Sequence, residues 1–152
     1  MIFVLGLLMG VVAGLRAMTP AAALSWAAYL GILKVSGTWL SFLGSIWAVA
    51  IFTVLALGEL ITDQLPTTPS RKIPVQFSTR VVIGAIAGVV IAGPANWIFG
   101  ALVGIVGAVI GTLGGASMRG KLAASFGRDR PAALIEDAVA IIGAALLVLA
   151  LK

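Results

Sequence analysis

The first 33 residues constrain the fold most, because Arg16 is the only charged side chain among them. Apolar runs of the same kind recur to the end of the chain, and a helix needs roughly 20 such residues to cross a bilayer. Overall, 61% of the residues are hydrophobic and only 10% are charged, which is typical of lipid-embedded proteins. We therefore expect an all-α protein: a polytopic transmembrane helical bundle forming a single integral membrane domain over residues 1–152.

Six apolar segments can be drawn between polar or proline-containing breaks. A single helix over residues 2–33 would be about 48 Å long, too long for a hydrocarbon core of about 30 Å. The break around Arg16 is therefore expected to be a real interruption. Pro20, Pro94 and Pro131 are each expected in the first turn of a new helix. The segments are 2–15, 20–33, 39–61, 81–93, 97–117 and 132–151, and the main breaks are 16–20, 34–38, 62–80, 93–96 and 119–131.

The basic residues divide unequally between the two sides of such a bundle. Six crossings put the breaks 16–20, 62–80 and 119–131 on one side, whereas Lys34 and Lys152 lie on the other. Basic residues are enriched in cytoplasmic loops, so both termini are predicted to face away from the cytoplasm. The first side carries Arg16, Arg71, Lys72, Arg80, Arg119, Lys121, Arg128 and Arg130.

A weak internal repeat relates the two halves of the chain, 1–76 and 77–152. Residues 6–18 and 84–96 share the pattern G-x-x-x-G-V-V, and three crossings in each half would make a 3+3 inverted repeat. The opening segment of each half is short and ends at a break, which in transporters can mark a binding site. Two alternatives stay open: chance similarity of glycine- and valine-rich sequence, and helices that continue through the breaks.

Cysteine and histidine are both absent. Their absence excludes thiol chemistry, a Ser/His/Asp triad and most transition-metal sites. The glycine-rich stretch around Gly120 does not match a phosphate-binding loop, because leucine follows Lys121. We therefore expect no enzyme activity, no catalytic residues, no cofactor and no metal, and no nucleic-acid partner.

Ionisable residues near the ends of the apolar segments are the best site candidates. Glu59 and Asp63 are four apart and share a helical face, where a carboxylate needs a cation, either Arg16 or a basic residue of the stretch 119–130. Burial raises the pKa of a carboxylate, whereas a neighbouring arginine lowers it. A proton-coupled switch requires a balance of these two effects. Alternatively, Glu59 is solvated at headgroup depth, and acids early in the last segment only complement a helix start. The candidates for a substrate or ion pathway are Arg16, Thr19, Glu59 and Asp63, followed by Asn96, Arg119, Glu136 and Asp137.

Two further patterns concern packing and lipid. Small residues four apart allow helix backbones to approach closely in lipid, so the regularly spaced glycines are expected at helix contacts. The basic breaks are expected to attract anionic lipid headgroups, by about 1 kcal/mol per residue. The glycines are Gly6, Gly10, Gly14, Gly84, Gly88, Gly100, Gly104, Gly107, Gly111 and Gly115.

Three strings resemble a known family: "GLRAMTPAAALSWAA" (14–28), "GELITDQLPTTPSRKIP" (58–74) and "GTLGGASMRGKL" (111–122). Together they look like a bacterial inner-membrane family, domain-of-unknown-function family 4126, along nearly the whole chain. The resemblance implies a small multi-pass protein of the bacterial inner membrane, and it implies no activity. Its recognisable positions here are Arg16, Thr19, Pro20, Glu59, Asp63, Pro66, Pro69, Arg71 and Pro74.

Three functional classes follow from these features. The first is a small transporter or channel-like protein, ion- or proton-coupled, with a polar site near the cytoplasmic mouth and an unknown solute or ion. The second is a structural or assembly protein that packs against a membrane partner. The third is a protein that binds lipid or acts on lipid headgroups. A bundle this small could need a second copy to enclose a pathway, so a homodimer is also considered.

Overall fold

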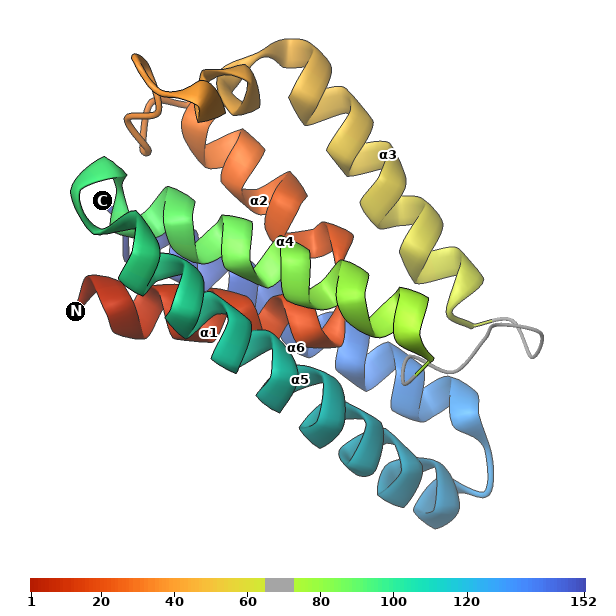
Figure 1. Ribbon diagram of the computed structural model, residues 1–152. Coiled ribbons are helices and arrows are strands. Elements are labelled where there is room, and N and C mark those ends of the chain that lie inside the picture. The colour runs from red at the N-terminus through yellow and green to blue at the C-terminus, as the bar shows by residue number, and fades with distance from the viewer. Residues whose placement is uncertain (65–72) are drawn as a thin grey trace.

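The computed structural model describes residues 1–64 and 73–152, and in these residues all regular structure is helical (Figure 1). The segments α4, η2 with α5, and α6 are long and apolar enough to cross a membrane. Two shorter helices, α1 and α3, are also apolar. The expected helical, membrane-type fold is confirmed at this level, whereas six full crossings stay a prediction. The elements are α1 (Ile2–Leu15), α2 (Met18–Tyr29), η1 (Trp39–Gly44), α3 (Ile46–Thr62), α4 (Pro74–Ala92), η2 (Pro94–Asn96), α5 (Trp97–Phe126) and α6 (Asp129–Leu149).

Successive α-helices run in alternating directions, and the two chain ends lie at the same end of the bundle (Figure 1). Helix α1 is central and packs against α4, α5 and α6. Helix α3 is peripheral, with its helix contacts concentrated on α2, where Trp26 Nε1 donates to Thr53 Oγ1 at 3.1 Å. The four-helix core of α1, α4, α5 and α6 is thus flanked on one side by the α2–α3 pair.

Glycines hold α5 against two neighbours at once. A methyl group added at Gly104 would overlap the backbone of Gly84 on α4, and one added at Gly107 would overlap the backbone of Leu7 on α1. The same is true of Gly111 against Val11. The regular glycine spacing therefore places α1 and α4 on two adjacent faces of α5, with backbones in direct contact.

The predicted interruption near Arg16 is real. Helix α1 ends at Leu15, Arg16 is extended with φ −140° and ψ 112°, and α2 begins at Met18. Pro20 is the third residue of α2, and Pro131 is the third residue of α6. Pro94 opens η2 after Gly93, whose φ of 76° favours glycine. All three prolines therefore lie in first turns, as predicted.

Two predicted breaks are wrong because each contains an arginine that lies within a helix. Helix α4 begins at Pro74 and has 19 residues, so the fourth segment is not the short 81–93 that was predicted. Helix α5 runs through the predicted break 119–131 as far as Phe126. Both extensions contain an arginine, Arg80 or Arg119, whose charge is paired inside the bundle. Hydropathy treats such charges as breaks even where they have partners.

The predicted segment 39–61 divides into η1 and α3 at Ser45, whose side chain accepts a hydrogen bond from the Ala48 amide. The segment predicted at 20–33 is α2, which ends at Tyr29. Because α1 has 14 residues and α4 has 19, the two halves do not open with matching short helices. The inverted repeat loses that support and is not confirmed.

The break between α1 and α2 lies well inside the bundle. Arg80, which contacts the end of α1, is six residues from the start of α4, a distance of about 9 Å along the helix. Asp137, which contacts Arg16, is eight residues from the start of α6, or about 12 Å. The ends of two short helices are thus held about 10 Å inward from the ends of their neighbours.

Candidate functional site

Arg16 joins the break to two other helices. Its side chain is fully buried, and its Nε donates to Asp137 Oδ1 on α6 at 2.6 Å. Its Nη1 pairs with Asp63 Oδ2 at the end of α3, and its Nη2 pairs with Asp137. A buried guanidinium without partners would be very costly, so these carboxylates are what allows Arg16 to occupy this position.

Glu59 binds the start of α2. The backbone amides of Ala17 and Met18 donate to Oε1 and Oε2 of its carboxylate, each at 2.8 Å. The first amides of a helix have no partner within the helix, and the positive end of the helix dipole favours an anion there. One side chain from α3 therefore satisfies two amides at a helix start buried in the bundle.

Arg80 binds the end of α1 in the complementary way. Its Nη1 donates to the carbonyl oxygens of Gly14 at 2.9 Å and Leu15 at 2.6 Å. Its Nη2 lies 3.5 Å from Glu59 Oε1. The gap between α1 and α2 thus holds a cation on the carbonyl side and an anion on the amide side, which is the favourable arrangement for both helix dipoles.

Arg119 connects α5 to α6 and α3. It donates from Nε and Nη2 to the Asp129 carboxylate, at 3.0 Å and 2.6 Å, and from Nη2 to the Asp63 carbonyl oxygen at 3.0 Å. Its Nη1 lies 3.6 Å from Asp63 Oδ2 and 3.5 Å from Glu136 Oε2. Gln64 Nε2 also donates to Asp137 at 3.5 Å.

These contacts form one cluster, which we call the break network. It contains three arginines together with all five acidic residues of the chain. Contacts among its members join α1, α2, α3, α4, α5 and α6. Its charged members are Arg16, Glu59, Asp63, Arg80, Arg119, Asp129, Glu136 and Asp137.

Six of the eight predicted site residues meet in this network, and Glu59 is neither solvated nor isolated. Glu136 and Asp137, for which a helix-start role was the alternative, face the bundle and are 8% and 6% exposed. Thr19 is buried in the first turn of α2 and lines an apolar groove instead. Asn96 is exposed in η2, at the opposite end of the bundle.

Arg80 and Asp129 were not identified as site residues from the sequence. The sequence does hold a signal for Arg80, because it is spaced by four from Gly84, a glycine at a helix contact, and therefore falls on the packed side of α4. Asp129 follows a short turn and has no comparable signal. The motif positions Pro66, Pro69 and Arg71 lie outside the described residues, as does the loop residue Lys72.

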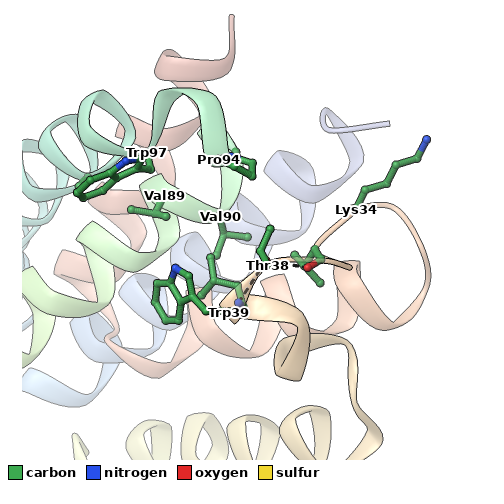
Figure 2. A pocket seen from close by; sticks show the side chains of 11 residues that line it. Lys34, Thr38, Trp39, Val89, Val90, Pro94 and Trp97 are labelled. Carbon is green, nitrogen blue, oxygen red and sulfur yellow. Dashed lines mark hydrogen bonds between the residues drawn. The ribbon is translucent and has the colours of Figure 1, made fainter.

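Grooves lined by residues of the described ranges lie around the helices. One of about 530 Å³ lies between α2, α3 and α6 and includes Thr19 and Trp26, and one of about 320 Å³ lies between α1, α5 and α6. The third, of about 440 Å³, is lined by Trp39 and Trp97 at the end opposite the break network. Figure 2 shows the ammonium group of Lys34 directed away from both tryptophans, so this third pocket is chiefly apolar.

Over residues 1–64 and 73–152, no three acidic side chains are grouped so that they could hold a metal ion. The acids of the break network are instead interleaved with arginines. Each acid therefore has a cation beside it, and together they form an ion-pair network that joins the helices.

Comparisons with known proteins add one finding. The model of a family described as a domain of unknown function (DUF4126) matches residues 3–151. No curated protein and no solved structure matches the chain.

Proposed function

We propose that this chain, which belongs to the DUF4126 family, is a small membrane transporter or channel-like protein whose ion- or proton-responsive site is the break network. The observation that carries the proposal is the tight junction between α1 and α2, where Arg80 contacts the end of the first helix and Glu59 contacts the start of the second. Many transporters bind anionic groups at such helix starts and cations at unwound carbonyls. Here two side chains of the protein occupy those positions.

The free-energy cost of placing charged side chains inside a membrane protein also supports this proposal. An ionisable side chain near the middle of a membrane helix costs about 2.5–3.5 kcal/mol on insertion scales, and such residues commonly mark ion or substrate pathways. The chain gathers eight charged side chains in one network, and several of them, such as Arg16, Arg80 and Asp137, are buried where apolar residues would pack at less cost.

Helix α3 is the element proposed to move. It packs mainly on α2, and its polar connections to α4, α5 and α6 run through Glu59, Asp63 and Gln64 at one end. Protonation of Glu59, or competition for it by a cation, would remove the charge that holds Arg80 and the start of α2. The end of α3 would then separate from the core, and the groove between α2, α3 and α6 would open toward the network.

Proteoliposomes containing a pH-sensitive dye test this proposal. Wild-type protein should give proton-linked flux above empty vesicles for at least one member of a panel of ions and small solutes. Glu59→Gln should reduce that flux at least about tenfold, because glutamine has no charge and presents an amide donor to a backbone amide. Lys34→Gln, which removes an exposed charge at the opposite end of the bundle and outside the groove between α2, α3 and α6, is the matched control. Wild-type flux equal to that of empty vesicles across the panel, from correctly folded protein, would refute transport.

A second candidate is a structural or assembly role, in which the network only holds the helices together. It is favoured by the outer surface of α3, where Trp47, Ile51 and Val54 are 75%, 56% and 67% exposed and could pack against a partner or a second copy of the chain. Photo-crosslinkers placed at these positions in cells separate the candidates. Repeated capture of one membrane protein, or of a homodimer, without any flux would favour the assembly role.

A further inference from the structure

We infer that the groove between α1, α5 and α6 binds one acyl chain of an anionic phospholipid, whose phosphate is held by basic residues at the turn between α5 and α6. This site lies beside the break network, whose Arg119 and Glu136 line one end of the groove. It does not depend on whether the protein transports anything.

The groove has the size and position of a lipid chain. Along α5 it extends from Ile110 to Leu122, a separation of 12 positions or about 18 Å. One leaflet of a hydrocarbon core about 30 Å thick is of similar depth. The groove opens on the membrane-facing surface, because several of its lining side chains, such as Met118 and Val139, are more than half exposed.

The groove has open space beside Gly114, which has no side chain to fill it. A methyl group added at Gly114 would meet no heavy atom within 4 Å, whereas one added at the neighbouring glycine Gly111 would overlap the backbone of α1. Gly114 is therefore not required for the packing of α1 against α5. Its missing side chain instead leaves space that faces the lipid.

Charge is concentrated at one end of the groove. Arg119, Glu136 and Ala132 line that end, and the exposed side chains of Lys121, Arg128 and Arg130 follow at the α5–α6 turn. Over the described part of the chain these three basic residues form no ion pair, because the nearby acids are engaged by the break network. An apolar groove ending at three available cations matches an acyl chain attached to a phosphate.

Native mass spectrometry of the purified full-length protein in detergent tests the inference. The probes are phosphatidylglycerol, which is anionic, and phosphatidylcholine, which is zwitterionic. Wild-type protein should retain one more phosphatidylglycerol than phosphatidylcholine. Gly114→Leu should weaken phosphatidylglycerol binding at least about tenfold by filling the groove, and replacing Lys121, Arg128 and Arg130 by glutamine should lower it to the phosphatidylcholine level.

Gly120→Leu is the matched control, because Gly120 lies on the same helix, also has open space around it and does not line the groove. It should bind lipid like the wild type. If Gly114→Leu lowers the helical content, Ile135→Trp narrows the same groove from α6 and replaces it. Equal binding by the groove-filling and control variants would overturn the inference. The inference would also be overturned if replacing the three basic residues lowered binding while Gly114→Leu left it unchanged, since that result indicates attraction of headgroups to the surface without a groove site.

Discussion

At the scale of single residues, Arg80 shows how much one side chain contributes to the break. Its guanidinium reaches two carbonyl oxygens of α1 and lies beside Glu59, so it serves a helix end and an acid together. A guanidinium presents five donors in a planar fork, whereas a lysine ammonium is a compact charge that cannot cover all three oxygens.

Arg80→Met should therefore destabilise the protein by about 3–5 kcal/mol, the range for removing one partner of a buried ion pair. Arg80→Lys should fall between Arg80→Met and the wild type. Unfolding of the purified protein in mixed micelles measures both. Arg128→Met, at an exposed position, should stay within about 0.5 kcal/mol of the wild type. A similar value for Arg80→Met would show that Arg80 does not stabilise the break.

Much of the site could be predicted from the sequence at this scale. The spacing of Glu59 and Asp63 and the need for a cationic partner pointed to Arg16, which Asp63 does contact. Arg80 was counted among the loop charges, because its partners include two backbone carbonyls, which any segment could provide. Sequence spacing identifies pairs of charged side chains better than it identifies which helix end a side chain will meet.

At the scale of elements, the glycines of α5 are of two kinds. Gly104 contacts the backbone of α4 and Gly107 that of α1, whereas Gly114 and Gly120 have open space around them. The spacing by four predicted close packing but not the partner, since a small residue accepts any backbone. The structure shows that Gly100 and Gly104 of α5 contact α4, whereas Gly107 and Gly111 contact α1.

Gly104→Ala should destabilise the bundle by about 1–3 kcal/mol, because the added methyl group overlaps the backbone of Gly84 and the two helices must separate. Gly120→Ala meets no atom and removes a flexible residue from a helix, so it should stabilise by about 0.5–1 kcal/mol. Both are measured by unfolding in mixed micelles. Equal stability of the two variants would mean that the contact between α4 and α5 is looser than described.

At the scale of the whole molecule, the two chain termini lie at one end of the bundle (Figure 1), and the break network lies around the far end of α1. Hydropathy predicted the helical membrane fold, since apolar length is a property of each segment alone. It could not predict how far the short helices extend through the bilayer. Helix α1, with 14 residues, is only about 21 Å long and ends where its neighbours continue.

The orientation of the whole molecule can be tested by cysteine labelling, because the chain has no native cysteine. With an impermeant maleimide on intact cells, Lys34→Cys and Lys152→Cys should be labelled from outside, since the basic end is expected in the cytoplasm. Arg128→Cys should be labelled only after the membrane is opened. All three side chains are exposed, so access to the reagent is not limited by burial. Labelling of Arg128→Cys and Lys34→Cys from the same side would reject this topology.

The gathering of all five acidic side chains in one place has a genetic consequence. Substitutions at positions far apart in the gene, from codon 59 to codon 137, should have non-additive effects on the same property of the protein. A second substitution among them should do less additional harm than the first, because the first already disturbs the shared arrangement. Suppressors of a lost carboxylate should accordingly arise at the arginines, on whichever helix they lie.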